Sequence, residues 1–190
     1  MQIKDYIKVY KNFLDKDVCN QTIKELSDEK CIYNDVGFYS PRTDNLTKVT
    51  NDDLDFLNDD YLITTKKIIQ DKLWFAIEQY IVKDFSYSYF CGWEGYSVPR
   101  FNRYKENKIM YKHCDHIHSL FDGKRKGIPI LSIIGALNND YEGGELIFFD
   151  DYKIDLKEGD VMVFPSNFLY PHRVEKVTKG IRYSYASWSW

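Results

Sequence analysis

The sequence has no long hydrophobic run, and this absence excludes a helical membrane protein. Charged residues interrupt every apolar stretch, so no window approaches the roughly 18 apolar residues of a membrane-spanning helix. The opening segment MQIKDYIKVYKNFLDKD is interrupted in the same way, and we expect neither a signal peptide nor a transit peptide there. We therefore expect a protein of the cytoplasm that makes no membrane association.

An excess of positive charge is also missing. The chain has 26 Lys and Arg against 29 Asp and Glu, a formal net charge of −3. A duplex-binding protein normally presents a basic face, so nucleic acid is an unfavoured partner. The one dense basic cluster, Lys124-Arg125-Lys126, lies between Gly and Pro signals and is predicted to be an exposed loop tip, with a substrate or phosphate contact as the alternative.

Closely paired cysteines are absent as well. Cys19, Cys31, Cys91 and Cys114 show no C-x-x-C spacing, which argues against a zinc knuckle or a redox motif. Scattered thiols of this kind are typical of a reducing compartment such as the cytosol.

Aromatic residues, by contrast, are abundant: 16 Tyr, 12 Phe and 4 Trp in 190 residues. Such a composition builds a packed core and excludes low-complexity disorder. The length fits one domain, and we find no internal repeat or linker.

Residues 1–85 are expected to be mostly helical. LDKDVCNQTIKEL offers Asp15 or Asp17 as a helix N-cap, and residues 62–81 carry an apolar stripe at helical spacing. That stripe consists of Ile69, Leu73, Ala76, Ile77 and Tyr80. Between the two helices, residues 38–53 predict a long surface loop that could serve either as a lid or as a plain connector.

The composition changes after Asp84. Short runs rich in β-branched and aromatic residues, such as IPILSIIGAL and DVMVFPS, alternate with turn signals such as NNDYEGG and VTKG. Short strands at this spacing indicate a β-sandwich or barrel. The fold class is therefore mainly β with flanking α-helices, in a single domain whose β-core covers residues 86–190.

One cluster of residues suggests metal chemistry. In YKHCDHIHS a strand would place His113 and Asp115 on one face, and His172, after the strand DVMVFPS, could supply a third ligand. Two histidines and a carboxylate on one side of a metal are typical of non-haem Fe(II) oxygenases, although zinc accepts similar ligands. His116 and His118 are alternative ligands at this stage, and His172 could instead be a loop histidine.

Arg182 strengthens the metal hypothesis. It lies ten residues after His172 across a Gly-containing turn, so we expect the two residues on neighbouring antiparallel strands. A buried arginine needs an anion, and its planar fork matches a carboxylate; a structural salt bridge is the alternative. The two-residue period of a strand puts Ser184, Ala186 and Trp188 on the face of Arg182.

An ordered set of motifs over residues 96–190 resembles the Fe(II)/2-oxoglutarate-dependent dioxygenases, and within them the prolyl 4-hydroxylase-like group. The matching segments are RYKENKIMYKHCD, ALNNDYEGGELIFF, and KEGDVMVFPS followed by PHRVEKVTKGIRYSYASW. The pattern is also similar to versions found in bacteriophages, in which case the protein would act in the host cytoplasm.

This resemblance implies a double-stranded β-helix (jelly-roll, cupin-like) core. It implies that His113, Asp115 and His172 bind Fe(II), that Arg182 pairs with the far carboxylate of 2-oxoglutarate, and that O₂ is the oxidant, with ascorbate as a supporting reductant. Oxidative decarboxylation to succinate and CO₂ would accompany hydroxylation of a substrate C–H bond. Trp188 and Phe164 would help keep the site dry, although core packing explains them equally well.

The chain departs from the family pattern around the cosubstrate. Met110 replaces a tyrosine, Asn107 replaces a glycine, and Ala136 replaces a tyrosine that in relatives helps hold the distal carboxylate. Tyr104 is retained, and it and Ser132 are the remaining hydroxyls that we expect to contact 2-oxoglutarate, beside Ser184 and Trp188.

The resemblance favours a peptidyl proline or another amino-acid residue as substrate, with a small molecule as an alternative. The branch of the superfamily that acts on nucleic acid carries a second arginine six residues after the first, where this chain has Trp188. A non-catalytic jelly-roll that binds a ligand or protein remains open, whereas a zinc hydrolase would leave Arg182 without a role. Residues 36–53 and 118–128 would set the substrate choice. The oligomeric state is not predicted.

Overall fold

The structure is a computed structural model, and it describes most of the 190 residues of the chain. The described ranges are 1–35, 38–40, 45–47, 55–57, 62–86, 95–115 and 129–190.

Two helices lie in the N-terminal half, where the sequence predicts them. Helix α1 covers Lys16–Leu26 with Asp15 at its N-cap position, and α2 covers Lys66–Glu78 and continues as a π-helical turn over Gln79–Asp84. A short 3₁₀-helix, Ile3–Tyr6, precedes them. The stripe predicted on the second helix is confirmed, because all five of its members are buried.

Strands form two main sheets. The large sheet has the order β1 (Lys8–Tyr10), β12 (Val161–Pro165), β8 (Leu131–Ala136), β15 (Arg182–Ser189), β6 (Arg100–Tyr104), β5 (Asp55–Leu57) and β2 (Tyr33–Asp35). The small sheet has the order β11 (Tyr152–Ile154), β10 (Leu146–Phe148), β13 (His172–Val174) and β7 (Met110–His113). Two further pairs are β14 (Val177–Lys179) with β9 (Glu142–Gly143), and β3 (Phe38–Ser40) with β4 (Asn45–Thr47). All the pairings in these sheets are antiparallel.

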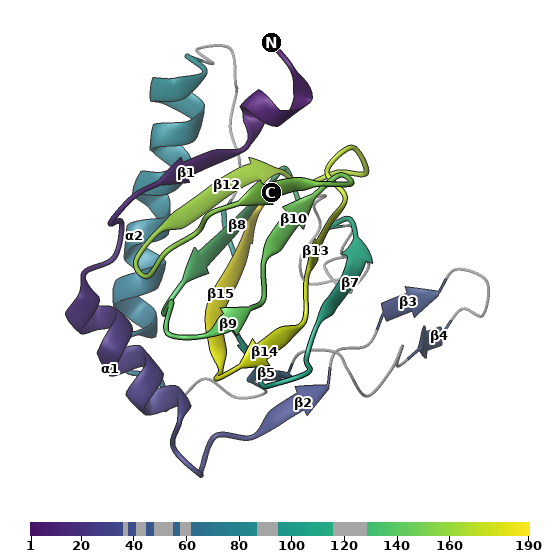
Figure 1. Cartoon of the computed structure of the whole chain (residues 1–190). Coiled ribbons are helices and arrows are strands. Elements are labelled where there is room, and N and C mark those ends of the chain that lie inside the picture. Colours follow the sequence, from purple (N-terminus) through teal and green to yellow (C-terminus); the bar gives the residue numbers. More distant parts are fainter. Residues whose placement is uncertain (36–37, 41–44, 48–54, 58–61, 87–94, 116–128) are drawn as a thin grey trace.

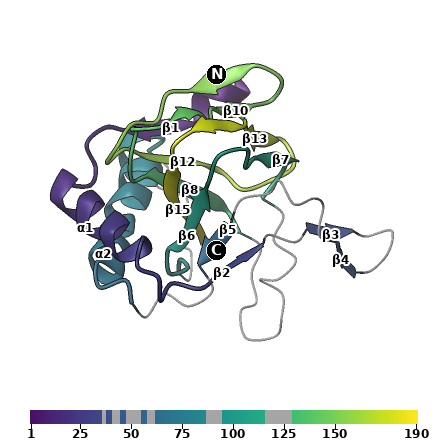
Figure 2. The same cartoon turned by 60° about the horizontal axis from the view of Figure 1, so that its bottom comes forward.

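The molecule is layered. Both helices cover one face of the large sheet, and the small sheet faces the other side (Figures 1 and 2). Apolar residues of the helices and of the covered face form one core, which includes Leu73, Phe101 and Tyr185. A second core, which includes Phe148 and Phe164, fills the space between the two sheets. This sandwich is the mainly β fold with flanking helices that the sequence predicts.

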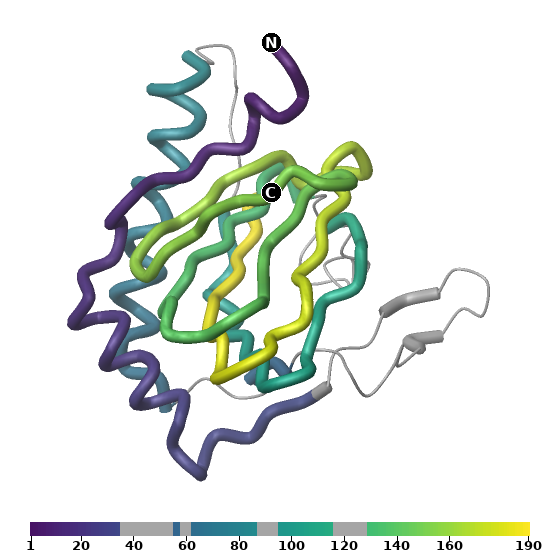
Figure 3. Tube along the Cα trace, in the orientation of Figure 1, coloured from purple at the N-terminus to yellow at the C-terminus, as the bar shows by residue number. Residues whose placement is uncertain are grey.

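The sheets recruit more of the N-terminal half than the sequence suggests. Strands β1, β2 and β5 all lie before residue 86, yet they belong to the large sheet, so the β-core is not confined to residues 86–190. Figure 3 shows the N-terminal trace running alongside β12, which is far away in sequence. The prediction of a loop over residues 38–53 also needs correction, because β3 and β4 pair there. These strands are three residues long, too short for a clear two-residue period.

Candidate metal centre between the two sheets

Two histidines meet across the small sheet. His172 of β13 stands directly opposite His113 at the end of β7, and their ring centroids are 4.4 Å apart. His172 is buried and stacks on Phe148 at 5.1 Å, with Phe164 edge-on at 5.2 Å. The antiparallel register and this aromatic packing therefore hold both imidazoles toward the space between the sheets.

Each imidazole is oriented by its own backbone. His113 Nδ1 lies 2.8 Å from the carbonyl oxygen of Tyr111, and His172 Nδ1 lies 3.0 Å from that of Tyr170. A carbonyl oxygen only accepts, so both Nδ1 atoms carry the proton and donate it. In each neutral ring, the Nε2 lone pair is then available to a metal.

Asp115 completes the cluster. It lies two residues past His113, just beyond the end of β7, and its Oδ1 is 3.4 Å from His113 Nε2 and 3.7 Å from His172 Nε2. Its Oδ2 accepts a hydrogen bond from Trp188 Nε1–H at 3.1 Å. One ligand atom from each of the three residues lies within 4.8 Å of the others, as the sequence predicts for His113, Asp115 and His172.

Burial sets the protonation of these ligands. It lowers the pKa of His172 to about 4, so this imidazole is neutral at pH 7 and can donate its lone pair. Burial also acts to raise the pKa of Asp115, but electrostatic interaction with the His172 and His113 imidazoles outweighs it and holds the pKa well below its usual range. Two neutral imidazole nitrogens and one carboxylate oxygen fit Fe(II), with the opposite coordination positions left for other ligands.

The large sheet supplies the opposite wall of this cavity. Arg182, Ser184, Ala186 and Trp188 all line it, which confirms that they share one face of β15. Arg182 is buried at 3 % exposure. Its guanidinium lies 4.8 Å from the centre of the Tyr104 ring, and its Nη1 donates to Ser184 Oγ at 3.2 Å. No carboxylate of the described residues pairs with it, so a buried cation faces the cavity ready for an anion.

Arg182 and His172 do not lie on neighbouring strands. His172 belongs to the small sheet and Arg182 to the large one, because β14 and its turn carry the chain from one sheet to the other. The expectation of adjacent strands is therefore wrong. The two residues instead face each other across the cavity, which leaves room between them for a ligand that spans from metal to arginine.

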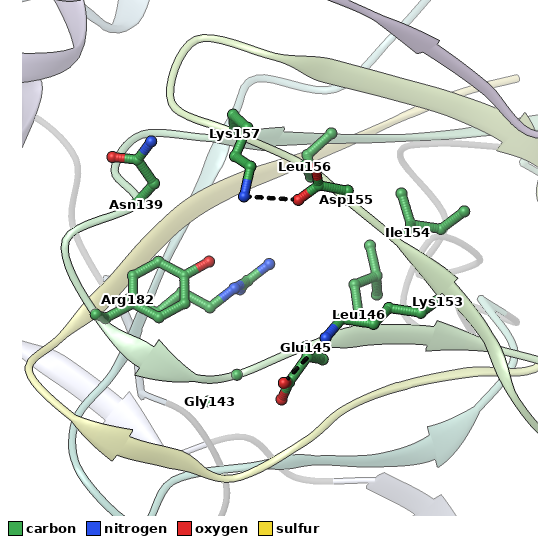
Figure 4. A pocket seen from close by; sticks show the side chains of 12 residues that line it. Asn139, Gly143, Glu145, Leu146, Lys153, Ile154, Asp155, Leu156, Lys157 and Arg182 are labelled. Atoms are coloured by element: carbon green, nitrogen blue, oxygen red, sulfur yellow. Dashed lines mark hydrogen bonds and ion pairs between the residues drawn. The ribbon is translucent and has the colours of Figure 1, made fainter.

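A second pocket opens on the other side of Arg182. Figure 4 shows the Arg182 side chain reaching into it. Lys157 pairs with Asp155 at 2.8 Å on the pocket wall, and Lys153 with Glu145 at 3.1 Å. Arg182 and Leu146 line both hollows and stand between them.

The departures from the family pattern have clear structural settings. Asn107 has φ = 68°, a left-handed conformation that glycine adopts most easily and asparagine tolerates. Met110 is buried in the wall of the cavity, where it offers no hydroxyl. Ala136 stands opposite Ser184, beside the end of β15 that carries Arg182.

The hydroxyls that we expect at 2-oxoglutarate lie at different ends of the site. Tyr104 stands directly opposite Arg182, and burial raises the pKa of its hydroxyl, so this group stays protonated. Ser132 stands opposite Trp188 instead, four residues along β8 from Ala136. The buried Oγ of Ser132 therefore lies at the Trp188 end of the site. This position does not support the expected contact between Ser132 and a carboxylate that Arg182 binds.

Sequence reasoning missed two polar residues of the cavity, Arg100 and Asn102. Both lie on β6 on the face of Tyr104, and a two-residue period counted back from Tyr104 would have found them. Other predicted features fall outside the described residues: His116, His118, the basic cluster at 124–126, and residues 118–128, with much of 36–53.

Comparison with known proteins agrees with this geometry. Residues 99–190 match the family model described as the 2OG-Fe(II) oxygenase superfamily. The match, just under half of the chain, includes His113, Asp115, His172 and Arg182. A PKHD-type hydroxylase of Xylella fastidiosa is 36% identical over 107 residues, which cover 47% of this chain and 43% of the relative. A PKHD-type hydroxylase of Idiomarina loihiensis is 37% identical over 90 residues, covering 46% and 39%.

The chain thus spans less than half the length of these curated relatives. Over this segment the chain is similar to PKHD-type hydroxylases of the 2OG-Fe(II) oxygenase superfamily, in agreement with the motifs. They are bacterial proteins, and they do not support the closer resemblance to bacteriophage versions.

Solved structures show the same fold. A prolyl hydroxylase of Trichoplax adhaerens, solved with a hypoxia inducible factor peptide, aligns with a TM-score of 0.73 at 15% identity over 98% of this chain and 84% of that one. A prolyl-4-hydroxylase of Pseudomonas putida aligns with a TM-score of 0.64 at 18% identity over 97% and 91%. At these identities the likeness establishes the jelly-roll fold.

Proposed function

We propose that this protein is an Fe(II)- and 2-oxoglutarate-dependent dioxygenase that hydroxylates a C–H bond of its substrate. The observation that carries the proposal is the convergence of His113, Asp115 and His172 opposite a buried Arg182 that pairs with no carboxylate of the described residues. When bound, Fe(II) and 2-oxoglutarate supply the oxidative chemistry with O₂, and the cosubstrate leaves as succinate and CO₂.

The protein's own residues bind and orient these groups. His113 and His172 present their Nε2 atoms because their Nδ1 protons are held by backbone carbonyls, and Asp115 presents Oδ1 because Trp188 holds Oδ2. Arg182 pairs with the far carboxylate of 2-oxoglutarate, and the adjacent Tyr104 and Ser184 are the hydroxyls nearest to that pair. Phe148 and Phe164 close the core behind His172 and exclude water from it.

For the substrate, we propose an amino-acid residue, with peptidyl proline first. The support is the set of relatives named as PKHD-type and prolyl hydroxylases, and the peptide in the Trichoplax structure. Nucleic acid is disfavoured because Trp188 occupies the place of the second arginine of that branch and packs against the metal ligand Asp115.

Cellular setting and supporting reductant belong to the same proposal. No helix among the described residues is long and apolar enough to cross a membrane. Cys19, Cys31 and Cys114 are free thiols, which fits the cytoplasm that the sequence predicts. Ascorbate would restore iron that has become oxidised without substrate.

The test needs no knowledge of the substrate. Purified protein is mixed anaerobically with Fe(II) and 2-oxoglutarate, and the weak visible charge-transfer band of the chelated cosubstrate is recorded. We expect the band in the wild type, no band in Asp115→Ala, and a band that needs more cosubstrate in Arg182→Ala. Asp150→Ala, which removes an exposed carboxylate, is the matched control and should behave as wild type. A folded wild type that shows no band, or that binds zinc only, would mean a binding module or another metalloprotein on the same fold.

A further inference from the structure

A second arginine, which is half-buried, faces the same cavity. Arg100 lies on β6 opposite Ala186, four residues before Tyr104, and it lines the cavity with the metal ligands. Its guanidinium lies 4.8 Å from the centre of the Trp188 ring and 5.9 Å from that of Phe56. Arg100 therefore stands at the Trp188 end of the cavity, next to Asp115, whereas Arg182 stands at the Tyr104 end.

Among the described residues, Arg100 has two aromatic stacking partners but no hydrogen-bond or ion-pair partner, and the carboxylate of Asp115 acts on it only as a nearby charge. Its Nε is buried and makes no hydrogen bond, and no described carboxylate lies within ion-pair distance of the guanidinium. The Oδ1 of Asn102, the next residue on the same face of β6, is also buried and without a hydrogen bond. Groups of this kind are expensive to bury unless a ligand satisfies them.

Arg103 on the same strand has the ion-pair partner that Arg100 lacks, although its Nε is likewise buried without a hydrogen bond. Its Nη2 donates to Asp55 Oδ2 at 3.1 Å, and its guanidinium lies over the Tyr33 ring at 3.5 Å. Arg103 points to the opposite face of β6, because strand neighbours alternate. Arg103, outside the cavity, thus forms an ion pair with Asp55, whereas Arg100, inside the cavity, forms none with the described residues.

The charges in the site with Fe(II) and 2-oxoglutarate bound argue that the anion that pairs with Arg100 comes from the substrate and not from the cosubstrate. On the proposed function, the charges of Fe(II) and Arg182 are balanced by Asp115 and the two carboxylates of 2-oxoglutarate. Arg100 then remains as the unbalanced charge among the described residues that line the cavity. An anion on the substrate would balance it.

We infer that Arg100 binds a carboxylate of the substrate and selects substrates that carry one close to the hydroxylated carbon. The inference rests on the proposed function and narrows its substrate class. A planar guanidinium matches a carboxylate with two parallel hydrogen bonds, and the Trp188 and Phe56 rings hold it in place. Free amino acids, the C-terminal residue of a peptide, and a residue beside an acidic side chain all provide this chemistry.

The decisive experiment compares acids with their neutral amides. Each of a panel of N-acetyl amino acids, N-acetyl-L-proline first, is added with its primary amide to the anaerobic protein with Fe(II) and 2-oxoglutarate. The shift of the charge-transfer band of chelated 2-oxoglutarate measures the affinity for each added compound. The amount of succinate formed in air measures turnover. We expect an acid to bind roughly 10- to 100-fold more tightly than its amide in the wild type. Arg100→Gln should lose this preference, and Arg100→Lys should keep part of it.

Two peptide arms separate the sources of the carboxylate. A proline peptide with a free C-terminus is compared with its amide, and an amidated Pro-Asp peptide with its Pro-Asn analogue. If no acid in any arm binds, or if an amide binds as well as its acid, the inference is wrong. The inference is also wrong if Arg100→Gln weakens the binding of 2-oxoglutarate as much as the binding of the acid, because Arg100 would then contact the cosubstrate. Absence of the band in the wild type would instead count against the proposed function.

An independent readout uses the metal-free protein. Removing a half-buried charge that has no hydrogen-bond or ion-pair partner among the described residues should not lower stability, so Arg100→Met should melt at or above the wild-type temperature. Arg103→Met, the matched control on the same strand, should melt lower because it leaves Asp55 without that partner. Equal destabilisation by both variants would show that Arg100 is already satisfied in the folded protein.

Discussion

Trp188 donates a hydrogen bond from Nε1 to Oδ2 of Asp115 at 3.1 Å and so links the large sheet to the metal-binding cluster. The bond occupies one carboxylate oxygen and leaves Oδ1 for the metal, 3.4 Å from His113 Nε2. It also fixes the plane of a carboxylate that lies beyond the end of its strand. A partner that orients a ligand in this way commonly influences metal affinity nearly as much as the ligand does.

Trp188→Phe should therefore weaken metal binding while the fold persists. Phenylalanine keeps an aromatic ring beside Arg100 but has no N–H for Asp115. We expect the dissociation constant for Fe(II), or for Mn(II) as a redox-stable substitute, to rise roughly 10- to 100-fold. Calorimetric titration measures it, and Trp74→Phe, at an exposed position of α2, is the control. Unchanged affinity in Trp188→Phe would show that Asp115 needs no such support.

Arg182 substitutions should act on the cosubstrate and leave metal binding largely intact. Loss of a buried cation that pairs with a carboxylate costs about 2 kcal/mol or more, so Arg182→Ala should weaken 2-oxoglutarate binding at least roughly 30-fold. The 2-oxoglutarate affinity of Arg182→Lys should lie between those of the wild type and Arg182→Ala, because lysine keeps the positive charge but loses the two-pronged hydrogen-bonding geometry of the guanidinium. Titration of the anaerobic Fe(II) protein measures both, with Arg173→Ala as the control at a surface ion pair. Equal losses in Arg173→Ala would mean that general charge, and not this contact, governs affinity.

The sequence predicts the site better than it predicts the sheets. His113, Asp115 and His172 carry a recognisable spacing, and the two-residue period of β15 is clear because the strand is eight residues long. Strands β1, β2 and β5 have three residues each, so their membership of the large sheet is decided by long-range pairing. The turn between His172 and Arg182 predicts that they lie on neighbouring strands. In the structure, the chain passes through the short strand β14 on its way from the small sheet to the large one, so the two residues belong to different sheets. The two-residue period of a strand, applied backwards from Tyr104, predicts that Asn102 and Arg100 lie on the same face.

Gly135 is predicted to be irreplaceable for a packing reason. It lies on β8 directly opposite Tyr185 of β15, and a Cβ built on Gly135 would overlap the Tyr185 ring, which is fully buried. Gly135→Ala should lower the free energy of unfolding by about 1–3 kcal/mol, because the ring has no free space to move into. Urea denaturation measures it. Gly95→Ala is the control, since a Cβ there would meet Trp190 at an ordinary 3.7 Å, and its change should stay within about 0.5 kcal/mol.

Asn107 is predicted to tolerate glycine and to resist alanine. It stands in a turn with φ = 68°, where its backbone N–H donates to the carbonyl of Val177 at 2.8 Å. A Cβ-bearing residue without a polar side chain is disfavoured by about 1–2 kcal/mol in this conformation, so Asn107→Ala should lower the free energy of unfolding by about that amount. Asn107→Gly should be at least as stable as wild type, because glycine adopts the conformation without strain. Urea denaturation of both variants, with Asn139→Ala as an exposed control, distinguishes the backbone effect from loss of the amide. If both variants lose the same stability, the asparagine side chain and not the left-handed backbone determines the preference at this turn.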